Sequence, residues 1–600
     1  MSIVALSKVT LYGPAAEKEA VLDGLQNLGC LHLNNLRPGT GEAADPEPSS
    51  PDARQALQYL QDSPVRRHAP RHLENVDVEA IVKEVLDVRD RSRALAEERE
   101  QLHKWIADMG PWGNFELPEW AKESTLRFWF YIVPHHQMQS LEAITLPWSV
   151  VGRDHRFAYV VVVAADQPAD MPVPPVPLEP RSIATMRERL GQVEQELEDL
   201  DDRRISLTHY RDLIHTTLDE ADDRAARHRA ALGVIDQDQI CVVQGWIPSE
   251  RSSALRQFAA DQQLGLTIEA PGPQDKPPTL LDNPPALRGG EDLVTFYMTP
   301  AYRLWDPSRA VFFAFAVFFA MIFSDAGYGL LLGGILAAMW RRLGRTDTGR
   351  DLREVMLALV VFSILYGVAV GTYFGVTPPA GSWLAALHVL DATDQRLMMW
   401  IAIGIGAAHL SYANLVTAWW RRHSPTTLSA LGWAAIILGG FCLGVGKSYP
   451  ALISLSGVGW GGLALGGLLV LLFTSERPFG LAPRLLFGRL VDGLKGVTEL
   501  SKAFGDVLSY LRLFALGLAS IKLAEAFNGL AATSFASKGV GVLLGLLILL
   551  IGHGINFAMG ILSGVVHGLR LNLIEFFNWS LPEEGQLFQA FEKKTTKVTE

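Results

Sequence analysis

The chain has 600 residues, enough for about four average domains, with a net charge of −11 and an ordinary 20% of charged residues. Only six charged residues occur between positions 355 and 475: Asp391, Asp394, Arg396, Arg421, Arg422 and Lys447. A water-soluble domain does not keep so few charges over such a length, so a purely soluble enzyme is excluded. The mild acidity, without a basic stripe, also argues against nucleic acid as a partner.

The first half of the chain is polar and is expected to stay in the cytoplasm. Its first residues, MSIVALSKVTLYGP, contain no basic region followed by a long apolar run, so we expect no signal peptide. The three cysteines, Cys30, Cys241 and Cys442, are far apart and form no CxxC pair. This spacing favours isolated buried thiols over a disulfide framework or a zinc site.

The chain begins with a predicted strand, helix and strand. Apolar residues alternate over 3–11 and again over 31–33, which is typical of strands, whereas 17–28 has the period of an amphipathic helix that Gly29 would end. Residues 37–52 are rich in Pro, Gly and acidic residues and predict a flexible loop.

Two long segments then carry apolar residues at heptad spacing. The first seam is Ile81, Val85, Val88, Ser92, Leu95, Arg99, Leu102, Ile106 and Met109. The second is Ile183, Met186, Leu190, Val193, Leu197, Leu200, Arg204, Leu207, Arg211, Ile214 and Leu218. Such spacing places an apolar seam on a charged helix, so we expect residues 79–109 and 181–232 to pair as a long antiparallel coiled coil.

A small α/β lobe is predicted at the end of this coiled-coil arm. Residues 128–133 and 159–163 have the composition of strands, and the Pro-rich stretch 172–180 leads back into the second helix. Further strands are predicted at 240–244 and 266–269.

No motif in the polar half indicates catalysis. It contains no HExxH, GxSxG or GxGxxG pattern. Elsewhere, Gly446-Lys447-Ser448 matches the end of a phosphate-binding loop, but Phe441 stands where that loop needs its first glycine. We therefore expect a non-catalytic chain that does not hydrolyse ATP itself and holds no cofactor or metal.

Eight membrane spans are predicted in the second half, near 308–325, 327–343, 353–375, 397–420, 427–446, 453–473, 503–531 and 538–575. The apolar block 308–343 would be about 54 Å long as one helix, well beyond a hydrocarbon core of about 30 Å. An acid and two glycines in its middle, Ser324-Asp325-Ala326-Gly327-Tyr328-Gly329, indicate a turn that divides the block into two spans.

Loop charge favours eight spans over seven. Basic residues gather at 341–353, at 421–422 and at 477–502. Because cytoplasmic loops collect Lys and Arg, these three loops should be cytoplasmic, and they are so only if eight spans follow a cytoplasmic first half. We therefore expect a multi-pass protein of the cell membrane with both termini in the cytoplasm.

Two arginines lie inside the last two apolar spans. Arg512 is in LSYLRLFALGLAS (508–520), and Arg570 is in VVHGLRLNLIEFF (565–577), with His567 one turn before it and Glu575 after it. An arginine in hydrocarbon costs several kcal/mol and stays charged. Each could snorkel or pair structurally with an acid, but two on adjacent spans favour an ion path, in which a fixed positive charge keeps a passing carboxylate ionised and repels cations.

Several ordered motifs accompany these arginines. They are LYGPAAEKEAVLDGLQNLGCLHL (11–33), PWG (111–113), QGWIP (244–248), PPTLLDNP (277–284), PAYRLWDPS (300–308), SDAGYGLLL (324–332), YGVAVGTYFG (366–375) and IGAAHL (405–410). With them the chain resembles, over essentially its whole length, subunit a, also called subunit I, of the V-type and archaeal/bacterial V/A-type rotary ATPases.

The resemblance implies a membrane stator subunit. Its expected partners are the ring of proteolipid (c/K) subunits, the peripheral stalk subunits of E/G type, the connector between the central stalk and the ring, and membrane lipid. Arg512 would be the essential arginine and Arg570 the second one. His567 and Glu575 match family positions, Glu575 either in a half-channel or as a cap of the helix end, and Ser509 and Asn556 complete the expected ion-translocation residues.

The chain also departs from its eukaryotic relatives. Where these have a histidine eight residues after the essential arginine, it has Ser520, and where they have a glutamate ten residues before the second arginine, it has Gly560. Asn556 and His553 are candidate polar substitutes. Asp325 is expected to cap the second span, and His409 to be a packed, hydrogen-bonded histidine.

The expected fold is mainly α. Residues 1–305 would form cytoplasmic α/β lobes with the coiled-coil arm, and 306–600 an eight-helix transmembrane domain for ion translocation. Two rival functions are a stand-alone secondary transporter with a cytoplasmic regulatory arm, which should show an inverted repeat, and a membrane-anchored scaffold or receptor, in which both arginines would be dispensable.

Overall fold

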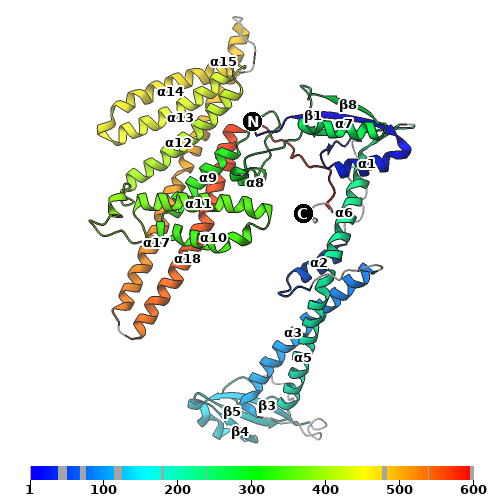
Figure 1. The fold of residues 1–600 in the computed structure, drawn as a ribbon. Coiled ribbons are helices and arrows are strands. Elements are labelled where there is room, and N and C mark those ends of the chain that lie inside the picture. Colours follow the sequence, from blue (N-terminus) through cyan, green and yellow to red (C-terminus); the bar gives the residue numbers. More distant parts are fainter. Residues whose placement is uncertain are drawn as a thin grey trace. The chain divides into compact units, whose positions relative to one another are not determined.

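The computed structural model describes residues 2–37, 50–67, 76–113, 125–176, 182–237, 239–475, 477, 483–537 and 539–594. It is mainly helical (Figure 1) and divides into two compact units. The membrane unit comprises Met1–Tyr12, Cys30–Asn34 and Val243–Ala590, and the arm unit comprises Gly13–Gly29, Asn35–Val242 and Phe591–Glu600. Segment 243–305 thus groups with the apolar helices. Most of the predicted loop 37–52 and the end of the Pro-rich stretch 172–180 lie outside the described residues.

The arm unit is built on α3 (Val78–Met109) and α5 (Ile183–Leu207), which run antiparallel. Their shared apolar cluster includes Leu102 and Val193. Arg189 fastens the pair from one side, because its Nε donates to Oε1 of Glu98 at 2.8 Å. The two heptad segments therefore pack on each other, while a supercoiled geometry remains a prediction.

The predicted coiled-coil segment 181–232 is not one continuous helix. A 3₁₀ turn at Thr208–Tyr210 separates α5 from α6 (Arg211–Gly233). The Thr208 hydroxyl donates to the carbonyl of Ile205 at 2.6 Å, and such local side-chain bonds compete with regular helical bonding. A further helix, α2 (Pro51–Gln61), includes the last two residues of the predicted loop 37–52. It starts with proline, which suits the first position of a helix.

The lobe between α3 and α5 is a three-stranded antiparallel sheet, ordered β3-β5-β4. Its strands are β3 (Arg127–Pro134), β4 (Trp148–Arg153) and β5 (Phe157–Ala164). Strand β4 was not predicted. The described residues of this lobe also contain a 3₁₀ segment, His135–Ala143, and its α/β character remains a prediction.

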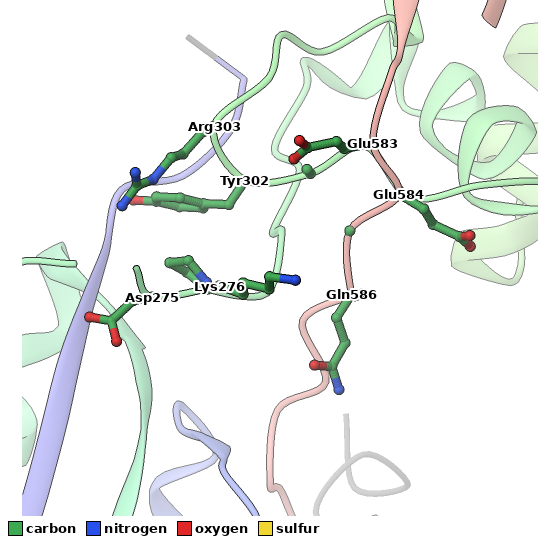
Figure 2. A pocket seen from close by; sticks show the side chains of 10 residues that line it. Asp275, Lys276, Tyr302, Arg303, Glu583, Glu584 and Gln586 are labelled. Atoms are coloured by element: carbon green, nitrogen blue, oxygen red, sulfur yellow. The ribbon is translucent and has the colours of Figure 1, made fainter. Parts of the chain in front are cut away.

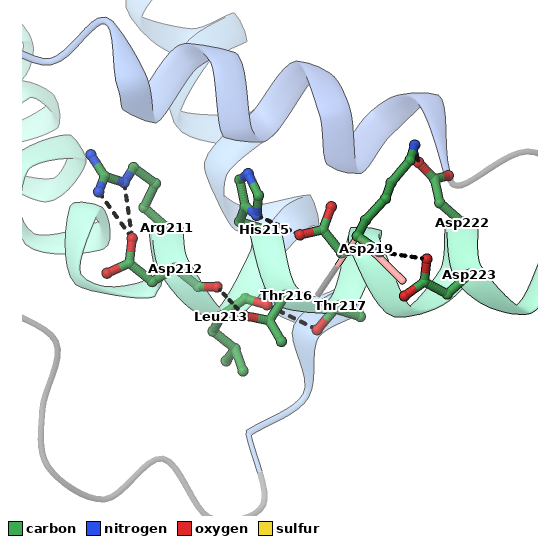
Figure 3. A network of polar contacts seen from close by, with 10 residues as sticks. Arg211, Asp212, Leu213, His215, Thr216, Thr217, Asp219, Asp222 and Asp223 are labelled. Atoms are coloured by element: carbon green, nitrogen blue, oxygen red, sulfur yellow. Dashed lines mark hydrogen bonds and ion pairs between the residues drawn. The ribbon is translucent and has the colours of Figure 1, made fainter. Parts of the chain in front are cut away.

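Acidic residues on α6 hold the C-terminal segment of the chain (Figure 3). The backbone N–H of Lys594 donates to Asp223 at 3.0 Å, and its ammonium pairs with Asp222 at 2.8 Å. On α1 (Lys18–Leu28), which Gly29 ends in the left-handed conformation as expected, Asp23 pairs with Lys593 at 3.0 Å and with Arg227. The described end of the chain is thus bound within the arm unit.

Acid is expected to release this C-terminal segment. Lys593 and then Arg227 lower the pKa of Asp23 below its usual 3.8. A lowered pKa means that the pair stabilises the fold above the unfolded pKa and loses this effect as pH falls through the folded one. Because Asp23 is partly exposed, the effect should stay below about 1 kcal/mol. We expect faster amide hydrogen exchange at Lys593 and Lys594 below about pH 4, after correction for the intrinsic rate.

The matched control is Asp23→Asn, which should show the same fast exchange already at neutral pH. Equal protection of the two amides in the variant and the unmodified chain at neutral pH would contradict the expectation.

The membrane unit contains a sheet in the order β2-β7-β1-β8. Its strands are β1 (Leu6–Pro14), β2 (His32–Leu33), β7 (Ile240–Pro248) and β8 (Gly265–Glu269), so all four predicted strand segments are found. The register pairs Val9 with Ile268 and His32 with Trp246, both antiparallel. The first residues of β7 belong to the arm unit and pair with β6 (Ile235–Gln237). Helix α7 (Ser252–Asp261) precedes β8.

The apolar half is a set of helices. Their bounds are α8 (Gly289–Thr295), α9 (Ser308–Phe323), α10 (Ala326–Leu343), α11 (Asp347–Val370), α12 (Gln395–Trp420), α13 (Thr427–Ser448), α14 (Ser454–Phe473), α15 (Pro483–Thr498), α16 (Leu500–Ser509), α17 (Leu511–Phe535), α18 (Val540–Arg570) and α19 (Phe577–Ser580). Within the described part, six helical segments are long and apolar enough to cross a membrane, and Ser308–Phe323 is a shorter apolar helix. The count of eight spans remains a prediction.

The apolar block 308–343 is divided where the sequence indicated a turn. Ser324 adopts the left-handed conformation and ends α9. Asp325, which is buried, caps α10 as expected: it accepts from the N–H of Tyr328 at 3.0 Å, and also from Phe374 and Gly375, both at 2.9 Å. Three backbone donors thus join the α9–α10 turn to the segment after α11.

The chain enters and leaves the apolar helices at adjacent places. The Thr279 N–H donates to the carbonyl of Gln586 at 2.7 Å, and the Gly585 N–H to that of Thr299 at 2.8 Å. A polar pocket of about 590 Å³ lies at this junction (Figure 2). It is lined by Asp275, Lys276, Pro277, Ala301, Tyr302, Arg303, Glu583, Glu584, Gly585 and Gln586.

Helices α9 and α18 interlock through a ladder of glycines and phenylalanine rings. A Cβ added to Gly560 would lie 3.0 Å from the Phe323 ring, one at Gly564 would lie 2.6 Å from Phe319, and one at Gly568 would lie 3.3 Å from Phe315. The glycines recur every four residues, so their faces line up along α18. Each ring therefore packs directly on helix backbone.

Candidate functional site

The two arginines lie on α17 and α18, which run side by side (Figure 1). Glycines let the two helices approach closely: a Cβ at Gly552 would come within 2.3 Å of the Phe527 ring, and one at Gly545 within 2.6 Å of Phe535. This contact runs antiparallel. It brings Arg512, in the first turn of α17, to the level of Arg570, the last residue of α18.

Glu575 lies between the two guanidinium groups. Its Oε1 is 3.9 Å from Nε of Arg570 and 4.0 Å from Nη1 of Arg512. The glutamate side chain is only 4% exposed, whereas Arg512 is 22% and Arg570 51% exposed. One buried carboxylate thus serves two arginines, of which one faces outward.

A π-helical turn places Glu575 there. The segment Leu571–Phe576 follows α18 as a π-helix. In an α-helix a residue five positions on points about 140° away, whereas the i to i+5 bonding of a π-helix brings residues five apart close together. Arg570 and Glu575 are five apart. Because helix α19 continues beyond this turn, Glu575 is not the cap of a helix end, and that alternative is wrong.

The other predicted residues near the arginines differ in their contacts. His567 lies one turn before Arg570, and its buried Nδ1 has no hydrogen-bond partner among the described residues. The Ser509 hydroxyl donates to the carbonyl of Gly505 at 3.1 Å, inside its own helix. The geometry therefore brings Arg512, Arg570 and Glu575 together, but it gives Ser509 no contact with them.

His409 is packed and hydrogen-bonded, as expected. Its Nδ1 is 2.8 Å from the hydroxyl of Tyr510, and its ring stacks on Phe576 at 4.3 Å. Tyr510 precedes α17 and Phe576 follows Glu575, so this histidine on α12 supports both sides of the arginine cluster.

A second polar cluster lies farther along the same two helices, about 12 Å from Arg512 for an eight-residue separation along α17. Asn556, which is buried, donates to the carbonyl of Ser520 at 2.9 Å and to the hydroxyl of Tyr328 at 3.0 Å. That hydroxyl is 2.7 Å from Nδ1 of His553. Nε2 of His553 is 3.0 Å from Oδ1 of Asn528. The side chains thus form one continuous chain of hydrogen bonds.

The hydrogen bonds of this cluster have a definite donor-to-acceptor direction. The amide oxygen of Asn528 can only accept, so Nε2 of His553 carries the hydrogen in the neutral ring and Nδ1 accepts from Tyr328. The amide of Asn528 then donates to the carbonyl of Phe374 at 2.8 Å. Proton exchange along hydrogen bonds is available to the hydroxyl and the imidazole but not to the amide at either end.

Two members of this cluster escaped the sequence prediction. Asn556 and His553 were candidates, but Tyr328 and Asn528 were not. The available signal was a polar residue in an apolar helix, since Asn528 stands sixteen residues after Arg512. Gly560, where relatives have a glutamate, packs on Phe323 and belongs to the glycine ladder instead.

Removing the Tyr328 hydroxyl should interrupt this series of hydrogen bonds. Tyr328→Phe leaves Nδ1 of His553 without its donor and one Asn556 N–H without its acceptor. Each buried group left unpaired costs about 1–3 kcal/mol. We expect a lower unfolding temperature of the purified chain in detergent.

The control for this change is Tyr412→Phe on α12, because Tyr412 is 45% exposed. A Tyr328→Phe variant no less stable than Tyr412→Phe would contradict the expectation.

Comparison with known proteins places this geometry in context. No family model matches the chain. It is 26% identical to the V-type ATP synthase subunit I of Chlamydia pneumoniae over 87% of its own length and 86% of that protein. It is 26% identical to V-type ATP synthase subunit I 1 of Treponema pallidum over 96% and 97%, and to the A-type ATP synthase subunit I of Methanocaldococcus jannaschii over 60% and 56%.

One solved structure, the cytoplasmic N-terminal domain of subunit I, homolog of subunit a, of V-ATPase, matches 44% of this chain and 99% of that one, with 18% identity and a TM-score of 0.23. The likeness to the bacterial relatives spans both the arm unit and the apolar helices.

Proposed function

We propose, from the membership of this chain in the family of V-type and A-type ATP synthase subunits I, that it is the membrane stator subunit of a rotary ATPase. The observation that carries the proposal is the pair of arginines on α17 and α18 that share the Glu575 carboxylate. A fixed positive charge among apolar helices costs several kcal/mol, and an ion path gives it a role. Residues 1–305 are proposed as the cytoplasmic arm and 306–600 as the ion-translocation domain.

In this proposal the arm binds the peripheral stalks, and α17 and α18 face the proteolipid ring. An ion enters one half-channel and neutralises a ring carboxylate, which can then move through lipid without the cost of a buried charge. Near Arg512 the carboxylate ionises again and releases its ion into a second half-channel. ATP chemistry takes place in other subunits, so this chain is not itself catalytic.

The cluster of Tyr328, His553, Asn528, Asn556 and Ser520 is proposed to line one of these half-channels. His553 and Tyr328 can exchange protons, while the amides hold them in position. His567 and Ser509, close to the arginines along the chain, are proposed for the other half-channel. This assignment would give the ion different routes on either side of Arg512.

Eight spans with both termini in the cytoplasm are part of the proposal. The backbone pairing of Thr279 with Gln586 and of Thr299 with Gly585 supports an even number, because the chain enters and leaves the helices at the same side. The break at Ser324–Asp325 supports counting α9 and α10 separately. The basic loops then lie in the cytoplasm.

Copurification tests the proposal. The full chain, isolated from membranes in mild detergent through an affinity tag, should bring nucleotide-binding subunits and a small proteolipid in a complex that hydrolyses ATP. Isolation as a stable homodimer that transports solute by itself would refute it and favour the secondary transporter.

A further inference from the structure

We infer that Glu575 is a resident counter-ion of Arg512 and Arg570, a positioning residue that sets the charge met by each ring carboxylate. The inference rests on the proposed function. It gives Glu575 a specific role, where the family resemblance implied either a half-channel position or a helix-end cap. It starts from the geometry of one buried carboxylate oxygen near two guanidiniums, at 3.9 and 4.0 Å.

The two ion pairs of Glu575 are short enough for electrostatic attraction but too long for hydrogen bonds. Good charge-assisted hydrogen bonds have donor–acceptor distances of about 2.7–2.9 Å. Nη1 of Arg512 and Oε2 of Glu575 are both buried and lack a hydrogen-bond partner among the described residues. Arg512 is therefore oriented by Glu575 while its donors stay available for a carboxylate that arrives from outside.

The charge balance of the cluster fits one such carboxylate. Two guanidiniums and one carboxylate leave a single net positive charge. The other titratable side chains around them are His567 on α18, Tyr510 before α17, His409 on α12 and Asp506 on α16. The imidazoles and the phenol carry no fixed charge. Asp506, which accepts from the indole of Trp579 at 2.8 Å, has its charge offset by Lys502 one turn before it on α16.

Without Glu575 the site would present two positive charges. The ring carboxylate would then stay ionised more strongly and accept its ion less readily. With Arg570 removed instead, the site would be neutral, and the carboxylate would take up its ion more readily. The π turn keeps the balance, because it holds Glu575 on the same side as Arg570.

The test uses the assembled complex in vesicles and measures ATP-driven transport against the concentration of the transported ion, as pH for protons or as sodium concentration. Glu575→Gln should raise the half-maximal ion concentration about tenfold, the effect of one unit charge about 10 Å away at an effective dielectric constant of about 20. Arg570→Gln should lower it by a similar factor. The double variant should return it to within about threefold of the unmodified complex.

Two further variants separate this role from a structural one. Glu575→Asp keeps the charge and should keep the half-maximal concentration, whereas a merely structural residue would lower the amount of complex without moving that concentration. An unchanged half-maximal concentration in Glu575→Gln, or a double variant as impaired as Glu575→Gln, would overturn the inference. If Glu575→Gln does not assemble, the opposite shift in Arg570→Gln decides. The proposed function fails separately, if Arg512→Ala transports normally.

Discussion

Replacing Arg512 with alanine is expected to abolish ATP-driven ion transport by the assembled complex. A unit charge about 4 Å from a carboxylate contributes about 4 kcal/mol at an effective dielectric constant of about 20, which corresponds to roughly a thousandfold in rate. Arg512 is the more buried of the two arginines, at 22% exposure against 51%. Its loss leaves Glu575 paired only with the more exposed Arg570, and the cluster becomes neutral.

The measurement is ion accumulation in vesicles that contain the purified complex, with ATP hydrolysis recorded in parallel. The matched control is Arg422→Ala, in the basic loop after α12, where the arginine is exposed. That variant should transport at nearly the unmodified rate. Full transport by Arg512→Ala would remove the basis for the ion path proposed here.

Replacing Asp325 with alanine is expected to destabilise the membrane unit by about 3 kcal/mol or more. The carboxylate accepts from three backbone N–H groups, those of Tyr328, Phe374 and Gly375. Asp325 is 2% exposed, so the freed donors would be only poorly reached by water. Each unpaired buried donor costs about 1–3 kcal/mol. Asp325→Asn keeps one acceptor oxygen and should lose less.

Thermal unfolding of the full chain in detergent, followed by intrinsic fluorescence, would measure this loss. Asp391→Ala is the matched control, because Asp391 also accepts from a backbone N–H, that of Thr393 at 2.8 Å, but in an exposed turn. It should lower the unfolding temperature only slightly. Equal effects of the two substitutions would contradict the importance of the buried cap.

Much of the fold follows from periodicity and composition. The heptad spacing predicted α3 and α5, and the apolar spans correspond to α9–α14, α17 and α18. The interruption at Thr208 was not visible, because it comes from side-chain bonds to the local backbone, while the heptad pattern continues through it. Helix α15 was also missed, since its basic residues indicated only a cytoplasmic loop.

The site was predictable in its charges but not in its geometry. An arginine in an apolar helix can be recognised without a structure, and Arg512 and Arg570 were both found in this way. The π turn could not be predicted, because it differs from an α-helix only in hydrogen bonding, so the sequence did not show that Glu575 lies beside both arginines. Tyr328 and Asn528 come from distant segments, and their meeting with His553 depends on tertiary packing.

The ladder between α9 and α18 has a mechanical consequence. Phe323, Phe319 and Phe315 pack against glycines spaced by four residues, a repeat of about 6 Å along a helix. A load that slid α18 along its axis by less than this repeat would press each ring against the bulkier residues between the glycines. The ladder therefore resists small sliding of the two helices past each other in either direction along their axes. In the proposed function, this resistance would keep Arg570, at the end of α18, in position under load.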